Sequence, residues 1–277
     1  MRIPYKANIA QGIGDNIMAR SYADQVKNQY EKIYFTHHAP IVEQQKNNSP
    51  EYWKFLNELG ILLFSDLPFI YNDGQHPFRS AEGLITDFNI TPQKPQRSVY
   101  IPLLCKGNSL KLDQEYIVLT TKLRYFDKST FYRLSPKLWK IIKELSKKYK
   151  IVVLGERVVE MCQDYKDHGE NQIYGIYEQI ISNVPADKIL DLTIPALGIT
   201  SPTLTQIQQD CLIINGAKFT ITLGVGGNFV MAMAVANMIG FRIDNEPIAD
   251  TIFTLKYSDA VVSKNWDEFS NILMSYL

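Results

Sequence analysis

The feature that most constrains the fold is the alternation of short apolar runs with longer amphipathic stretches. Residues 116–120 (YIVLT) and 150–154 (KIVVL) are nearly continuous apolar runs of strand length. Between them, Leu138, Ile141 and Leu145 recur at helical spacing. Buried strands that alternate with helices predict parallel β-sheet covered by helices on both faces. The expected fold class is therefore α/β.

The alternation forms two series that are separated by polar, turn-rich sequence. The segment LLCKGNSLKLDQE lies between them, and a chain of 277 residues suits two domains of ordinary size. We place the boundary near residue 110. The prediction is two Rossmann-like, doubly wound domains, 1–110 and 111–277, that face each other across a cleft. Whether the last helix packs back on the first domain is left open.

The individual elements are assigned from period and end signals. Strands are predicted at 6–10, 32–36, 61–65, 116–124, 150–156, 188–195 and 219–223. Helices are predicted at 15–30, 51–60, 135–149, 173–182, 203–217, 229–240 and 267–277. Gly60 is expected to stop one helix, and Ser135 with Pro136 is expected to open another.

Charge and composition narrow the classes of partner. Lys+Arg and Asp+Glu are both 29, so a zero net charge does not favour bulk electrostatic binding of nucleic acid. No apolar run approaches the roughly 20 residues that span a bilayer, and the N-terminus has no apolar signal region. The 3 cysteines form no CxxC pair. We expect a cytoplasmic protein without disulfide, metal site or cofactor, and leave a homodimer open.

Ligands of open α/β sheets bind outside the carboxyl ends of the strands, and the first such position carries Gly12-Ile13-Gly14-Asp15-Asn16. A dinucleotide fingerprint would need glycine at position 17, which is isoleucine, and no Gly-Lys-Ser/Thr completes a P-loop. Asp15 at this turn is a candidate general base. The alternative is a first-turn acid that complements the helix dipole.

Two further strand ends carry polar residues. Thr120 and Thr121, followed by Lys122 and Arg124, offer hydroxyls and cations that suit a diphosphate. Glu156 follows the next strand, where acidic residues of nucleotide-binding folds accept hydrogen bonds from ribose hydroxyls. The alternatives are a solvated strand end and a surface acid in a turn.

The last candidate site is a glycine-rich turn between a strand and an apolar helix. It comprises Gly224, Val225, Gly226, Gly227 and Asn228. Three glycines in four positions make sense if backbone N–H groups at a helix N-terminus face an anion.

On the first half, His37 and His38 follow a strand and, with Gly14 and Asn16, are candidates for the acceptor side of a site. A histidine pair in a turn is also common as a structural or exposed feature.

In chain order, these sites resemble the GT-B glycosyltransferases, and most of all the ADP-heptose:lipopolysaccharide heptosyltransferase group. The resemblance rests on Gly-x-Gly-Asp opening a helix, Thr-Lys and Gly-Glu after two successive strands, and the late glycine turn. It implies that Asp15 deprotonates the acceptor hydroxyl, that Thr121 and Lys122 contact donor phosphates, and that Glu156 contacts the nucleoside. The turn at 224–228 would cradle the donor phosphates.

One departure from the group concerns the donor. The heptosyltransferases usually carry Asp-Thr/Ser-Gly in the late turn, followed by a histidine, whereas this chain has GVGGN with no histidine near. We therefore expect a donor other than ADP-heptose.

The function predicted from these residues is transfer of a sugar from a nucleotide-diphosphate sugar to an acceptor hydroxyl, with inversion and without a metal. The partners are a nucleotide sugar and a glycan or other hydroxyl acceptor. A sugar-nucleotide epimerase or hydrolase of the same shape and a non-catalytic nucleotide- or sugar-binding module remain as alternatives.

Overall fold

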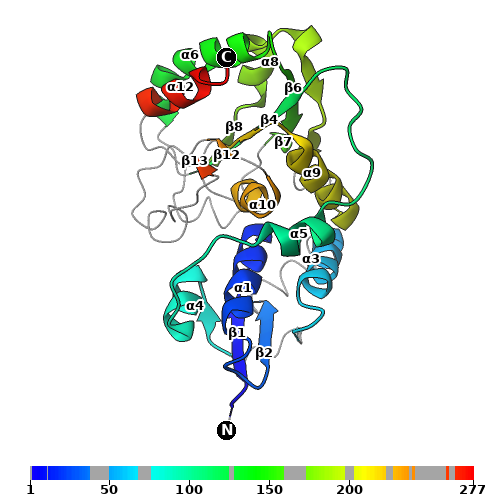
Figure 1. Cartoon of the computed structure of the whole chain (residues 1–277), viewed down its shortest axis with the longest axis vertical. Helices are drawn as coiled ribbons and strands as arrows, with labels where there is room; N and C mark the ends of the chain where they lie inside the picture. Colours follow the sequence, from blue (N-terminus) through cyan, green and yellow to red (C-terminus); the bar gives the residue numbers. More distant parts are fainter. Residues whose placement is uncertain are drawn as a thin grey trace.

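The computed structural model describes residues 2–10, 12–37, 50–67, 76–124, 128–158, 173–196, 203–222, 227–236, 239–240, 260–261 and 266–277. Two parallel sheets lie at opposite ends of the molecule, with helices α5 (Arg97–Leu104) and α10 (Gly227–Val235) between them (Figure 1). The predicted α/β class is confirmed. None of the helices in the described ranges is both long enough and apolar enough to cross a membrane.

The smaller sheet belongs to the front of the chain. Strands β1 (Tyr5–Ile9), β2 (Ile33–His37) and β3 (Phe78–Arg79) are parallel in the order β2-β1-β3. The helices of this half of the chain follow the strands in sequence. They are α1 (Ile13–Val26) after β1, α3 (Pro50–Leu63) after β2 and α4 (Ala81–Phe88) after β3. Helix α1 is buried over most of its length, because the sheet lies on one side of it and α10 on the other.

The larger sheet has the doubly wound order. Its strands are β4 (Tyr116–Thr120), β6 (Lys150–Leu154), β9 (Ile189–Asp191), β11 (Thr220–Ile221), β12 (Ile239–Gly240) and β13 (Ala260–Val261). They are all parallel and lie in the order β13-β12-β11-β4-β6-β9. From β4 the chain adds β6 and β9 on one side. It then returns to the other side of β4 and adds β11, β12 and β13, as in dinucleotide-binding folds.

Helices cover both faces of this sheet. Alternate strand residues such as Val118 pack toward α9 (Leu204–Gly216) and α10 (Gly227–Val235). Their neighbours, such as Leu119, pack toward α6 (Lys128–Leu145) and α8 (Tyr177–Asn183), which is followed by the 3-10 turn η1 (Ala186–Lys188). Helix α12 (Trp266–Met274) packs against α6, and Lys137 Nζ lies 3.0 Å from Asp267 Oδ1. The last helix thus lies on the second half of the chain.

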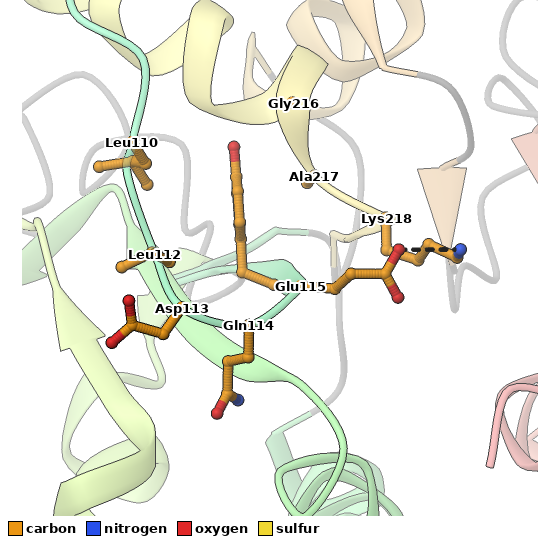
Figure 2. Close-up of a pocket in the computed structure, with 9 residues that line it drawn as sticks. Leu110, Leu112, Asp113, Gln114, Glu115, Gly216, Ala217 and Lys218 are labelled. Atoms are coloured by element: carbon orange, nitrogen blue, oxygen red, sulfur yellow. Dashed lines mark hydrogen bonds and ion pairs between the residues drawn. The ribbon is translucent and has the colours of Figure 1, made fainter.

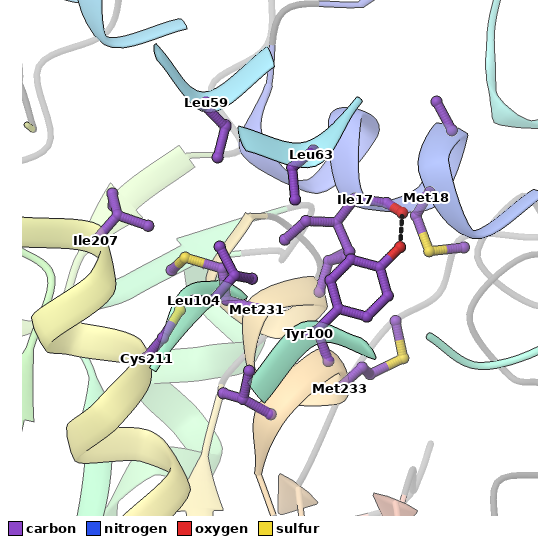
Figure 3. Packing of buried hydrophobic residues seen from close by; sticks show 14 of the residues in the cluster. Ile17, Met18, Leu59, Leu63, Tyr100, Leu104, Ile207, Cys211, Met231 and Met233 are labelled. Carbon is purple, nitrogen blue, oxygen red and sulfur yellow. Dashed lines mark hydrogen bonds between the residues drawn. The ribbon is translucent and has the colours of Figure 1, made fainter. Parts of the chain in front are cut away.

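One apolar core joins the two sheets. Helix α5 (Arg97–Leu104) packs against both α9 and α10, and α1 packs against α10. Figure 3 shows side chains of α1, α3, α5, α9 and α10 converging in this core. The hydroxyl of Tyr100 on α5 donates to the carbonyl of Ile17 on α1 at 3.1 Å. The halves are therefore held by helix packing, and the cleft expected between them stays a prediction.

The structure corrects two predicted helix ends. Residues 61–65 are not a strand: α3 continues through Gly60, and Leu56, Leu59 and Leu63 are buried at helical spacing. Pro136 does not open a helix, because α6 begins at Lys128 and contains Pro136 in its interior. A short apolar run and a Ser-Pro pair are both compatible with a helix interior when the preceding residues are already helical.

Several predicted elements are divided. The strand predicted at 116–124 breaks at Thr121 into β4 and β5 (Lys122–Arg124), and β5 pairs antiparallel with β8 (Ile173–Gly175). The helix predicted at 173–182 therefore begins only at Tyr177. The strand predicted at 188–195 becomes β9 and β10 (Ile194–Ala196), and β10 pairs with β7 (Glu156–Val158). The helix predicted at 229–240 spans Gly227–Val235 and is followed by β12.

Candidate functional site

The topological switch point of the larger sheet lies between β4 and β11. From β4 the chain proceeds to β6 on one side, whereas from β11 it proceeds to β12 on the other. The helices that follow these strands diverge to opposite faces, which leaves a crevice at the carboxyl ends where ligands of such sheets bind. The carboxyl ends of β4 and β11 are therefore the candidate site.

Four threonine hydroxyls are buried in this part of the sheet. Thr120, Thr121, Thr220 and Thr222 are each at most 1% exposed. Among the residues that the structure describes, none of their Oγ1 atoms has a hydrogen-bond partner. Burial of an unpaired hydroxyl costs about 1–3 kcal/mol, so these hydroxyls mark this part of the sheet as a candidate ligand site.

Strand register places three of these hydroxyls on one face. Thr220 pairs with Val118 and Ile221 with Leu119, so the next residue on each strand sets Thr222 beside Thr120. Side chains alternate along a strand, so Thr120, Thr220 and Thr222 lie on the same face of the sheet as Val118. Helices α9 and α10 cover this face. Helix α10 is the next described element after β11, and it begins at Gly227. The hydroxyls and a helix N-terminus thus approach the same crevice.

The predicted residues after β4 lie at this edge. Thr121 is held by its backbone, because its N–H donates to Leu154 O at 3.0 Å and its carbonyl accepts from Ile176 N at 2.9 Å. Lys122 and Arg124 follow in β5, opposite Gly175 and Ile173, and only their backbone lies within the described structure.

Glu156 lies one strand further along the same edge. It begins β7, is 8% exposed and follows Gly155, whose φ of 107° favours glycine. Its position next to the switch point is the one at which acids of doubly wound folds meet the ribose.

A polar cluster beside Glu156 was not expected from the sequence. Asp191, at the end of β9, accepts hydrogen bonds from Tyr177 Oη (2.7 Å), Thr193 N (3.0 Å) and Arg157 Nη2 (3.0 Å). Burial alone would raise the pKa of Asp191, but these donors lower it on balance. The cluster ties β7, β9 and α8 together. The available signal was an aspartate at a strand end with a threonine two residues later, Asp191-Leu192-Thr193.

The late glycine turn is only partly described. Gly224, Val225 and Gly226 lie outside the described residues, whereas Gly227 and Asn228 form the first positions of α10. His38, predicted on the acceptor side, also lies outside them.

The predicted acceptor-side residues of the first half form a second group at the carboxyl ends of β1 and β2. Gly12 caps α1, Gly14 is buried and Asp15 is exposed in the first turn. A Cβ on Gly12 would collide with Asp15 Oδ2, so the carboxylate folds back over the cap. Asn16 Oδ1 lies 3.2 Å from Nε2 of His37, the last residue of β2. The predicted residues are thus gathered in two groups, one at each sheet.

A cavity of about 550 Å³ lies at the opposite edge of the larger sheet. Figure 2 shows Leu110 and Leu112 on one side of it and the ion pair of Glu115 with Lys218 (3.1 Å) on the other. The cavity opens at the amino ends of β4 and β11 and is therefore separate from the switch point. Within the described ranges, no three His, Cys, Asp or Glu side chains are grouped so as to hold a metal ion.

Comparison with known proteins concerns the fold. No protein-family model and no curated protein matches the sequence. The structure is similar to that of TibC, an iron-containing dodecameric glycosyltransferase of enterotoxigenic E. coli, with a TM-score of 0.51 and 12% identity. That match covers 94% of this chain and 62% of TibC. E. coli ADP-heptose lipopolysaccharide heptosyltransferase II matches over 100% of this chain and 99% of its own, at 14% identity and a TM-score of 0.49. The match to TibC confirms the expected resemblance to a glycosyltransferase for the fold alone.

Proposed function

We propose that the protein is a glycosyltransferase that moves a sugar from a nucleotide-diphosphate sugar to an acceptor hydroxyl. The observation that carries the proposal is the set of buried threonine hydroxyls at the switch point of a doubly wound sheet, which have no partner among the described residues. Such hydroxyls suit the oxygens of a diphosphate, and the fold likeness to a solved glycosyltransferase directs the choice among phosphate-containing ligands.

The donor would lie along the carboxyl edge of the larger sheet. Thr120, Thr121 and Thr222 would donate to the diphosphate oxygens, together with the N-terminus of α10. Lys122 and Arg124 would neutralise the charge that develops on the leaving diphosphate in the transition state. Glu156 would accept hydrogen bonds from the ribose hydroxyls.

The acceptor would approach from the first half of the chain, across the cleft between the two domains. Asp15 would take the proton of the acceptor hydroxyl while its oxygen attacks the anomeric carbon, with Gly14, Asn16 and His37 around it. Asp15 is exposed in the first turn of α1, which supports access by a substrate. Direct displacement with an aspartate base leads to inversion at the anomeric carbon.

The proposal includes transfer without a metal. Its support is that the sequence has no acidic Asp-x-Asp motif and that two cations, Lys122 and Arg124, follow β4 directly. Activity that is unchanged by excess EDTA would agree with this mechanism. Complete loss that Mn²⁺ or Fe²⁺ restores would contradict it.

The test of function is a transfer assay with UDP-, GDP-, ADP- and dTDP-sugars and a mixture of sugar acceptors. We expect one nucleoside diphosphate to be released, only when acceptor is present, and Asp15→Asn to abolish release while donor binding persists. Release without acceptor indicates a hydrolase. Donor binding without any turnover, equal in wild type and Asp15→Asn, indicates a binding module.

A further inference from the structure

A buried hydrogen-bond network lies behind the glycine turn that precedes α1. Asn16 is fully buried and its Nδ2 donates to the carbonyl of Gly12 at 2.9 Å and that of Ala10 at 3.5 Å. The backbone N–H of Asn16 donates to the same Gly12 carbonyl at 3.1 Å. One side chain thus holds the carbonyls on both sides of the bend between β1 and α1.

His37 completes the network from the neighbouring strand. Because Nδ2 of Asn16 faces two carbonyls, its Oδ1 is the atom that faces His37, and His37 Nε2 must donate the 3.2 Å hydrogen bond. Burial lowers the pKa of His37 to about 4, so the ring is neutral near pH 7 and carries its proton on Nε2. The edge of the ring also contacts Trp53 of α3 at 6.0 Å between centroids.

The network reaches Asp15 through Gly12. The carboxylate of Asp15 occupies the space where a Cβ of Gly12 would lie. Any shift of the Gly12 carbonyl, which Asn16 holds, therefore moves the surface against which that carboxylate rests. Behind the network, β2 and β1 are bonded by a hydrogen bond from Thr36 to Asn8, which keeps His37 in register with Ile9.

We propose that Asn16 and His37 are positioning residues that hold the Gly12 turn and, through it, aim the Asp15 carboxylate. The inference rests on the proposed function for its consequence, because the aimed carboxylate is the base of the transfer reaction. Many helices are capped by a short polar side chain at the N-cap position. The N-cap of α1 is Gly12, which has no side chain to make such a hydrogen bond. The holding group instead comes from a buried amide and a histidine on another strand.

The test uses two substitutions at one position of the full-length protein. His37→Phe keeps a ring against Trp53 but cannot donate to Asn16. His37→Gln offers an amide N–H near the place of Nε2. The first readout is amide hydrogen exchange in a peptide spanning 12–17. We expect exchange about tenfold faster in His37→Phe, near wild type in His37→Gln, and unchanged in β4 and β11 in both.

The second readout is the rate of transfer. A misplacement of about 1 Å can lower a rate by about 10²-fold, so kcat of His37→Phe should fall by about that factor while KM for the donor changes less than twofold. His37→Gln should recover most of the loss. Gly12→Ala, which displaces the carboxylate directly, should lower kcat in the same way. If His37→Phe does not fold, wild-type kcat in Gly12→Ala overturns the proposed aiming of Asp15.

The outcomes separate the two proposals. Wild-type exchange and kcat in His37→Phe would overturn the positioning role. A fall in kcat that His37→Gln does not recover, or that is matched by a rise in donor KM, would also overturn it. If the wild type transfers no sugar, the proposed function fails, and the exchange of residues 12–17 alone decides whether the pair holds the turn.

Discussion

Replacing Thr121 or Thr222 at the candidate site by valine should make the free protein more stable. Thr222 and Thr121 are at most 1% exposed, and within the described structure their hydroxyls lack a partner. Valine has nearly the same shape without the hydroxyl, so each change removes a desolvation penalty of about 1–3 kcal/mol. For a chain of 277 residues the entropy of unfolding is about 0.6 kcal/mol per degree, so Tm should rise by about 2–5 °C.

The matched control is Thr36→Val. Thr36 is also 1% exposed, but its hydroxyl donates to Asn8 Oδ1, so valine leaves a buried acceptor unpaired. This variant should lose about 1–3 kcal/mol. Urea unfolding and calorimetry of the free proteins measure both effects. If Thr222→Val and Thr121→Val lose stability as Thr36→Val does, their hydroxyls have partners and the reasoning that makes them a ligand site is refuted.

Three further predictions concern other positions. Burial raises the pKa of Asp210 to about 6, and the hydrogen bond from Gln206 opposes this rise only weakly. Because the unfolded chain releases this proton at lower pH than the folded protein, the free energy of unfolding of the wild type should fall as pH rises from about 4 to 6. Asp210→Asn should match the wild type near pH 4 and exceed its free energy of unfolding by about 3 kcal/mol at pH 7, measured by urea unfolding. Gly107→Ala should lower the free energy of unfolding by about 1–3 kcal/mol, because φ of Gly107 is 131° and a Cβ would collide with Gln209 Oε1. Stability equal to that of the wild type would show that the turn relaxes. Glu156→Gln should weaken nucleoside diphosphate binding at least tenfold in calorimetric titration and leave pyrophosphate binding unchanged. Equal weakening of both ligands would exclude a ribose contact.

The α/β class and the places of the candidate sites could be predicted from the sequence. Runs such as YIVLT and KIVVL are buried strands whatever surrounds them, and the carboxyl ends of parallel strands are where ligands bind. Thr121 and Glu156 were predicted in this way, and the structure places both at the carboxyl ends of strands β4 and β6.

Other features depend on tertiary contacts that local sequence does not encode. Thr222 became a candidate only when β11 proved to pair with β4, because the register sets it beside Thr120. The bond between Asn16 and His37 joins residues on different elements and has no local pattern. The end of α3 was mispredicted at Gly60. The helix continues to Leu63, because Gly60 and Leu63 are both buried in the apolar core.

The central claim is that the switch point of the larger sheet binds a nucleoside diphosphate. The most direct measurement is calorimetric titration of UDP, GDP, ADP and dTDP into the wild type and into Thr222→Val. We predict that one nucleotide saturates the wild type, that it stabilises the protein by about 2.7 kcal/mol at a hundredfold excess over Kd, and that Thr222→Val weakens it at least tenfold. Absence of binding by all four at millimolar concentration, or equal affinity in Thr222→Val, would contradict the account.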